Sequence, residues 1–218
     1  MSQQQISIDD QQPLLIRFFA HLFSYIFHPL FIPLYVTWFL AFIHPSYFSG
    51  LSVHEKVFVL IRVAYIMIFF PVITVFLLKQ LNFISSFFLK TQRDRIIPYV
   101  ACGIYFFWMY LVFKNSESAP IILTVFIMGI FLSSSAALIT NIYYKISMHA
   151  IGMGGLLGIF LIIMRSNTML MTLPMSLALL IAGVVSSSRL IVSDHTQKEI
   201  YMGLLVGILC QLVAMIIV

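Results

Sequence analysis

Seven long runs of apolar residues, separated by short polar segments, constrain this chain more than any other feature. The runs cover residues 19–43, 57–78, 96–113, 120–142, 150–164, 168–187 and 200–218. A helix needs about 20 apolar residues to cross a hydrocarbon core of about 30 Å. In lipid, backbone polar groups must be satisfied within the segment itself, which favours helices. The sequence therefore predicts an all-α, polytopic transmembrane bundle with six or seven spans.

The first run decides between six and seven spans. It contains His28, Pro29 and Pro33, and a proline inside a helix removes a backbone donor and kinks or breaks the helix. This run is therefore expected to be a kinked, interfacial or re-entrant segment, or else a seventh span. Residues 1–18 are assigned to a polar N-terminal tail, and residues 19–218 to one transmembrane domain.

Composition excludes several other classes of protein. Hydrophobic residues make up 61% of the chain, charged residues 9%, and the mean hydropathy is +1.06, far from the values of soluble domains. The net charge of +5 is attributed to basic loops, so no nucleic-acid partner is expected. The expected location is a cell or inner membrane, with a multi-pass topology. No feature of the sequence indicates an oligomeric state.

The ionisable residues gather at one membrane face. If the runs alternate in direction, the loops 79–95, 143–149 and 188–199 share a face. That face carries Lys79, Lys90, Arg93, Arg95, Lys145, Arg189 and Lys198, together with His149 and His195. The positive-inside rule would make this face cytoplasmic. Several of these cations are candidate phosphate ligands, however, and without them the bias disappears, so the orientation stays open.

The loop before the last run has a spacing typical of a nucleophilic histidine. On a helix expected to begin near Asp194, His195 and Glu199 lie on one side, so the carboxylate can hold one imidazole nitrogen and leave the other free to attack. Arg189 ends the preceding run, and its planar guanidinium can bind two phosphate oxygens. These groups indicate chemistry on a phosphate. The alternative is that they are charges flanking two spans, which leaves His195 unexplained.

A second candidate element opens the run at residue 150. Here the hydroxyl of Ser147, backbone N–H groups and the helix dipole can face an anion, and His149 can protonate a leaving oxygen. For His149 alone, the alternative is an interfacial histidine with a structural hydrogen bond. Gly154 and Gly158 fit a small-xxx-small helix contact and are assigned to packing.

These residues resemble the type-2 phosphatidic acid phosphatase superfamily of membrane lipid phosphatases. Its third motif is Ser-Arg, five residues, His, three residues and Asp. Ser188, Arg189 and His195 match this motif, with Glu199 in place of Asp. Its second motif, Pro-Ser-Gly-His, is matched in part by Ser147 and His149, with Ile146 and Met148 in place of Pro and Gly.

The first motif of the family, a Lys followed six residues later by Arg-Pro, is where the chain departs from the pattern. One loop contains Lys90, Arg93, Arg95 and Pro98, but Arg and Pro are not adjacent in it. The resemblance covers roughly residues 90 to 210 and is that of a divergent branch.

The resemblance implies a metal-independent reaction with no cofactor. His195 would attack phosphorus to form a phosphohistidine, His149 would protonate the departing lipid oxygen, and Glu199 would orient His195. The groups implied to bind the phosphate are Arg189, Ser188, Ser147, Lys145, Arg93 and Arg95. The substrate would be a lipid phosphate or pyrophosphate whose tails stay in the bilayer.

Three other functions stay open at this point. The chain could be a catalytically inactive member of the family that acts through interactions in the membrane. It could be a lipid transporter or flippase, although internal repeats and ionisable residues near the midplane, which are typical of transporters, are not seen in the sequence. It could also be a lipid phosphotransferase that uses the same pair of histidines, with an alcohol in place of water.

Overall fold

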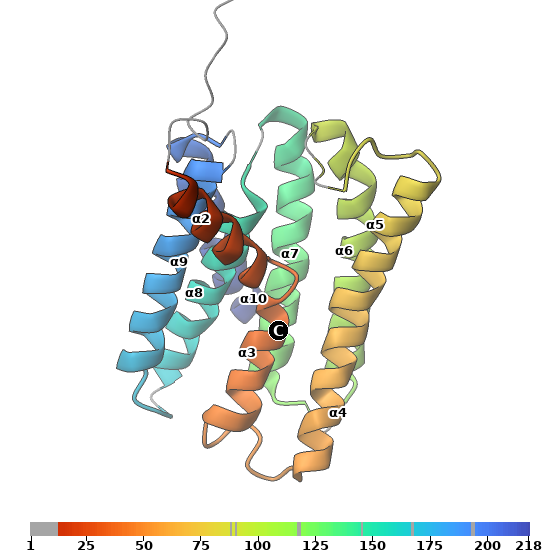
Figure 1. Cartoon of the computed structure of the whole chain (residues 1–218). Helices are drawn as coiled ribbons and strands as arrows, with labels where there is room; N and C mark the ends of the chain where they lie inside the picture. Colours follow the sequence, from red (N-terminus) through yellow and green to blue (C-terminus); the bar gives the residue numbers. More distant parts are fainter. Residues whose placement is uncertain are drawn as a thin grey trace, which may run out of the picture.

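The structure of the protein is a computed structural model that describes residues 13–87, 89, 91–116, 119–144, 146–166, 168–192 and 195–218. These residues form helices and loops, with no strand among them. Six helices are long and apolar enough to cross a membrane (Figure 1). The prediction of an all-α helical bundle is confirmed, with the smaller of the two expected numbers of spans, as in a multi-pass membrane protein.

The first of these six helices is continuous but contains a π-helical turn. It consists of α4 (Val53–Ala64), η2 (Tyr65–Phe69) and α5 (Phe70–Gln80). The other five are α6 (Gln92–Lys114), α7 (Ile121–Tyr143), α8 (Met148–Ser166), α9 (Thr172–Val192) and α10 (Gln197–Ile217). Since consecutive helices run in opposite directions, the α5–α6, α7–α8 and α9–α10 loops lie at the same end of the bundle (Figure 1).

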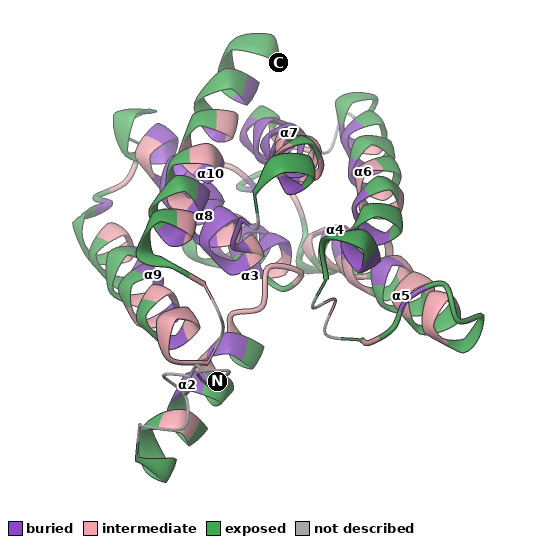
Figure 2. Ribbon diagram, turned by 90° about the horizontal axis from the view of Figure 1, so that it is seen from above, coloured by how far each residue is buried: buried purple, intermediate pink, exposed green. Residues whose placement is uncertain are grey.

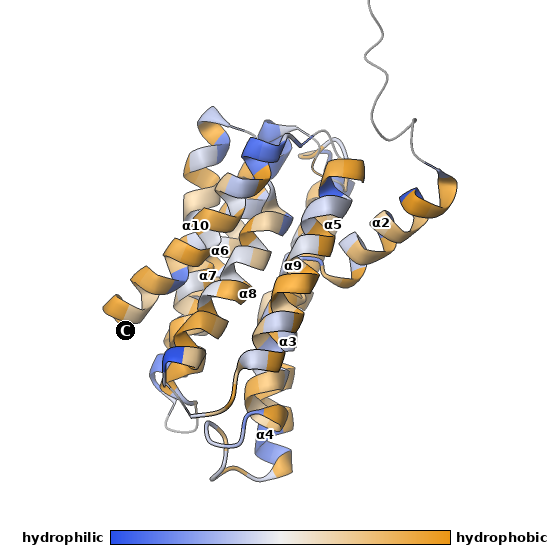
Figure 3. Ribbon diagram, turned by 90° about the vertical axis from the view of Figure 1, so that its left-hand side faces the viewer, coloured by the Kyte–Doolittle hydropathy of each residue, from blue (hydrophilic) through white to orange (hydrophobic). Residues whose placement is uncertain are grey.

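The first apolar run is broken rather than a full span. It forms α2 (Leu14–Ile26), α3 (Ile32–Trp38) and a π-helical turn, η1 (Phe39–Ile43). The break falls at His28 and Pro29, as the sequence predicts, because proline lacks the donor that would continue the helix. Figure 3 shows α2 leaving the bundle at an angle. Residues 14–18, assigned to the polar tail from the sequence, form the beginning of α2 instead.

Burial differs among the helices and places two of them at the centre. In their most apolar windows, 67% of the residues of α8 and 56% of those of α7 are buried, against at most 28% in the other four spans. Viewed from above, the buried colour concentrates on α7 and α8 (Figure 2). The outer helices expose apolar side chains on their outward faces, as expected of surfaces that meet lipid.

Glycines allow α8 and α10 to approach each other closely. A Cβ atom at Gly207 would overlap the carbonyl oxygen of Ile151, and one at Gly154 would overlap the carbonyl oxygen of Leu204. Small residues permit such contacts between membrane helices. The packing role expected for Gly154 is therefore confirmed. Because His149 lies at the start of α8 and His195 just before α10, this contact also fixes the distance between the two histidines.

A hydrogen-bond network closes the opposite end of the bundle. His44 Nε2 lies 3.1 Å from the hydroxyl oxygen of Thr168, which lies 3.0 Å from that of Ser166. The Ser166 hydroxyl in turn lies 3.2 Å from that of Tyr47. Burial lowers the pKa of His44 below its ordinary value, which favours the neutral ring. This network ties the end of η1 to the loop that follows α8.

We expect Gly207→Ala to destabilise the protein, because the new methyl group must push the α8 and α10 backbones apart. Overpacking of this kind costs about 1–3 kcal/mol. The measurement is the thermal unfolding temperature of the purified protein in detergent. Gly183→Ala is the matched control, since nothing lies within 4 Å of a Cβ atom at Gly183 on α9. Equal unfolding temperatures for the two variants would contradict the close-packing account.

Candidate active site

A cavity of about 890 Å³ lies within the bundle and is lined by residues from most of the helices. Its polar part contains Arg95 from α6, His149 from α8, Arg189 from α9 and His195, which precedes α10. These four residues come from distant parts of the sequence and belong to loops or helix ends on the same side of the bundle. The prediction that one end of the bundle carries the chemistry agrees with this placement.

His195 and Glu199 form a hydrogen-bonded pair. His195 Nδ1 lies 2.8 Å from Glu199 Oε2, and the two side chains are 5% and 24% exposed. Since the carboxylate accepts, Nδ1 carries the proton, and Nε2 keeps its lone pair in the neutral ring. The sequence predicted this pair, and the structure brings the two side chains together.

The pair does not arise in the way the sequence suggested. The helix α10 begins at Gln197 rather than near Asp194, which lies outside the described residues. Thr196 is the N-cap, and the Glu199 carboxylate turns back to accept from the Thr196 backbone N–H in a capping box. Glu199 therefore has two roles, because the same oxygen that stabilises the helix start also holds His195.

His149 is held by a backbone group of the N-terminal segment. The side chain is buried, and its Nε2 lies 3.1 Å from the carbonyl oxygen of Ser24 in α2. A carbonyl oxygen can only accept, so Nε2 carries the proton and the neutral ring has its lone pair on Nδ1. The ring is close enough to interact electrostatically with Arg189 and His195. The structure thus places both predicted histidines and Arg189 at one site.

Two guanidinium groups share this part of the cavity. Arg95 is 5% exposed, and it donates from Nε to the carbonyl oxygen of Leu89 at 2.8 Å and from a terminal nitrogen to that of Ile146 at 3.4 Å. Its charge interacts with that of Arg189. Like charges that line one cavity repel each other, so a bound anion between them would stabilise the arrangement.

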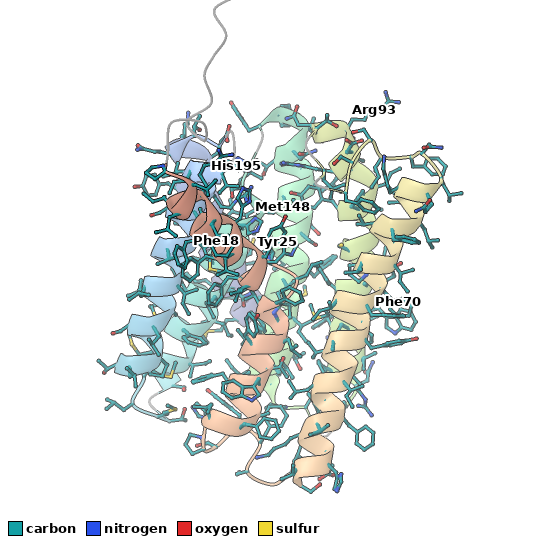
Figure 4. All side chains as sticks on the ribbon, viewed as in Figure 1. Phe18, Tyr25, Phe70, Arg93, Met148 and His195 are labelled. Atoms are coloured by element: carbon teal, nitrogen blue, oxygen red, sulfur yellow. The ribbon has the colours of Figure 1, made fainter. Side chains whose placement is uncertain are left out.

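Arg95 and Arg93 were both predicted to bind the phosphate, but in the structure only Arg95 lines the cavity. Arg93 is exposed at the start of α6 and is not among the residues that line the cavity. Figure 4 shows its side chain pointing away from the bundle. Two positions along a helix differ by about 200° in direction, so the two arginines face opposite sides. Arg93 is therefore not placed at the site.

Two predicted hydroxyl ligands are used elsewhere, and one predicted lysine cannot be placed. Ser147 is completely buried, and its oxygen accepts from the backbone N–H of Ala150 at 3.4 Å in the first turn of α8. Ser188 donates to the carbonyl oxygen of Val184 at 2.8 Å within α9. Neither serine lines the cavity, because short side chains at helix positions are easily held by nearby backbone groups. Lys145 lies outside the described residues.

The N-terminal segment contributes residues that the sequence analysis did not assign to the site. His21, Tyr25 and His28 all line the cavity, and Tyr25 is close enough to Arg189 to interact with it electrostatically. An ionisable residue inside an apolar run is a signal of function in membrane proteins. His28 carries that signal. In the sequence, however, His28 was used together with Pro29 and Pro33 only to predict an irregular helix, and not as a residue of the site.

Below the polar part, the cavity continues between apolar side chains. Its wall includes Phe106, Phe126 and Ile130, and it reaches Gln211, fourteen residues after the start of α10. That distance corresponds to roughly 20 Å along a helix. On one side, the lining residues Val72 and Phe76 of α5 are 52% and 51% exposed. The cavity is thus long and mostly apolar, and α5 forms one edge of its opening.

Comparison with models of protein families, with curated proteins and with solved structures found no match for this chain. What the site can do therefore follows from its own geometry and from the local motif resemblance of residues 90–210.

Proposed function

We propose that this protein is an integral membrane phosphatase that hydrolyses a lipid phosphate or pyrophosphate through a phosphohistidine intermediate. The observation that supports it most is the gathering of four side chains in one cavity: His195, which is paired with Glu199, and His149, Arg95 and Arg189. A nucleophile with its orienting acid, a second histidine and two cations are the parts that a phosphoryl transfer needs. The motif resemblance suggests the same reaction.

In the first step, Nε2 of His195 attacks phosphorus, and the bond from phosphorus to the lipid oxygen breaks. His149 gives a proton to that oxygen, so the lipid leaves as an alcohol or, from a pyrophosphate, as a monophosphate. In the second step, water attacks the phosphohistidine, His149 takes up a proton from the water, and the bond from phosphorus to Nε2 breaks. Inorganic phosphate is released, and both histidines return to their starting states.

The hydrogen bonds of the two histidines suit these roles. Glu199 holds the Nδ1 proton of His195 and stabilises positive charge on the ring during attack. The Ser24 carbonyl holds the Nε2 proton of His149, so Nδ1 is the atom that would carry the transferred proton. A negatively charged phosphate beside His149 favours the doubly protonated ring, which means that substrate binding prepares the acid. Arg95 and Arg189 would stabilise the charge on the equatorial oxygens.

The shape of the cavity supports an amphipathic substrate. Sites for small molecules are mostly apolar, with a few polar groups that fix orientation. Here the two arginines and His149 and His195 lie at one end, and the cavity extends roughly 20 Å from them to Gln211, between mostly apolar side chains. A headgroup phosphate would lie between the arginines and histidines, with hydrocarbon in the apolar part or across the edge formed by α5. The enzyme would act in the cell or inner membrane.

We expect the purified protein to release inorganic phosphate from a lipid phosphate in the presence of a chelator. Arg95 and Arg189, rather than a divalent ion, would neutralise the phosphate. The measurement is phosphate release from phosphatidate, phosphatidylglycerophosphate and a polyprenyl pyrophosphate in detergent, with His195→Ala as the control. His195→Ala should lower the rate by at least about 1000-fold. Equal rates in wild type and His195→Ala would reject His195 as the nucleophile.

We expect Arg95→Gln to lower the rate of phosphate release by about 100-fold or more, since a preorganised donor to a developing charge has an effect of this size. Arg93→Gln is the matched control, because it makes the same change at an exposed position of the same helix, two residues away. It should leave the rate close to that of wild type. If the two variants lost activity equally, the assignment of Arg95 to the phosphate would be wrong.

We expect Glu199→Gln to separate the two roles of this side chain. Glutamine can still complete a capping box, so the unfolding temperature should change little. A neutral amide stabilises the charged His195 ring less, and its N–H can donate to Nδ1 and so hold the ring in the wrong tautomer, so the rate should fall at least about tenfold. Thr196→Ala, which removes the N-cap but keeps the carboxylate, should show the opposite pattern. A fully active Glu199→Gln variant would remove this carboxylate from the mechanism.

A further inference from the structure

His28 stands beside the proposed general acid without having been assigned a role. Its ring and that of His149 are 5.1 Å apart between centroids and nearly perpendicular, at 85°. Both rings line the cavity that contains His195, Arg95 and Arg189. A half-buried histidine in an apolar segment of a membrane protein is typical of a functional residue.

The break between α2 and α3 holds His28 in this position. Pro29 follows it directly and packs on Gly152 of α8, where an added Cβ atom would lie 3.2 Å from the Pro29 Cβ. Gly152 is three residues after His149, so both lie on the same face of α8. A larger side chain at position 152 would push Pro29, and His28 with it, away from the site.

The hydrogen bonds of His28 fix which ring nitrogen carries the proton. The backbone N–H of Leu30 donates to His28 Nδ1 at 3.3 Å, so Nδ1 is the acceptor and the proton of the neutral ring is on Nε2. Among the described residues, none accepts a hydrogen bond from His28 Nε2. The structure thus leaves one N–H donor of His28 available in the wall of the cavity.

The same ring stays neutral at physiological pH. Burial, together with the positive charge of Arg189, lowers the pKa of His28 to about 4. A neutral donor is useful beside two arginines and a histidine that must itself become charged. It can bind an oxygen of the substrate without adding a further positive charge that would oppose protonation of His149.

We propose that His28 is a substrate-binding residue that donates a hydrogen bond from Nε2 to an oxygen on the leaving-group side of the bound phosphate. This inference rests on the proposed function, since it takes His195 as the nucleophile and His149 as the acid. In-line transfer places the attacking and leaving oxygens or nitrogens on opposite sides of phosphorus. His28, which contacts His149, belongs to the leaving side. The broken N-terminal segment is then part of the site rather than only a cover over it.

Two substitutions separate the donor of His28 from its structural role. In His28→Gln, the amide nitrogen can take the place of Nε2, so the donor is kept. In His28→Asn, the amide oxygen can take the place of Nδ1 and accept from Leu30, but nothing replaces the Nε2–H. His54→Asn is the matched control, because His54 is exposed at the start of α4, at the opposite end of the bundle.

The first measurement is the binding of orthovanadate, whose five-coordinate complexes have an apical oxygen in the place of the leaving oxygen. We expect His28→Asn to weaken binding about 10- to 100-fold, the effect of a hydrogen bond to a charged group. His28→Gln should bind within a few-fold of wild type, as should His54→Asn. In protein labelled with ¹⁵N-histidine, vanadate should shift the Nε2–H signal of His28, which the His28→Gln variant identifies among the six histidines.

The outcomes distinguish this inference from the proposed function. Wild-type vanadate affinity in His28→Asn, or an unmoved His28 signal on binding, would overturn the inference even if lipid phosphate is hydrolysed. Weakened binding in His28→Asn, in a protein that hydrolyses none of the lipids, would keep His28 as an anion ligand and reject the phosphatase. Equal losses in His28→Asn and His28→Gln would assign His28 to structure alone, which also overturns the inference.

Discussion

The contact between α8 and α10 is the constraint on which the rest of the structure depends. Lipid offers no hydrophobic driving force for helix association, so these helices are held by close van der Waals packing. Gly154 and Gly207 bring the two backbones together without intervening side chains. The contact also determines the site, since His149 begins one helix and His195 precedes the other. For His149, a position on a rigid helix holds the ring more precisely than a position on a loop would.

The broken N-terminal segment adds lining residues to the cavity and a hydrogen-bond partner for His149. The break at His28 and Pro29 turns the chain between α2 and α3, where Pro29 packs on Gly152 of α8. The break also sets the backbone of α2 against His149, whose Nε2 lies 3.1 Å from the Ser24 carbonyl oxygen. The helix α2 packs along α9, and its own outer face is apolar and exposed. The broken segment thus forms one wall of the cavity.

Burying a charged side chain in a mostly apolar chain costs free energy, so the positions of the buried charges indicate where function lies. Burial of a cation in an apolar environment is unfavourable unless hydrogen bonds or an opposite charge compensate for it. Arg95 is compensated in part by two backbone carbonyl groups and lies in electrostatic contact with Arg189. A phosphate group that binds between them would supply the remaining compensation. The proposed reaction would use these two cations to favour a substrate with negative charge, and the mostly apolar remainder of the cavity favours one with a hydrocarbon part.

The sequence by itself determined the helical membrane class, the packing role of Gly154 and the pairing of His195 with Glu199, and it marked the first run as irregular at His28, Pro29 and Pro33 while leaving a seventh span open. These features depend on local periodicity, on proline chemistry and on short spacings, which act within one or two turns. The hydrogen bonds of Ser147 and Ser188 to backbone groups three or four residues away are equally local, although the sequence analysis assigned both hydroxyl groups to the phosphate. Only the tertiary structure decided that Arg95 enters the cavity while Arg93 faces outward. Only the tertiary structure brought His28 beside His149. These outcomes depend on the rotation of each helix about its axis and on contacts between residues more than a hundred positions apart, which no local pattern encodes.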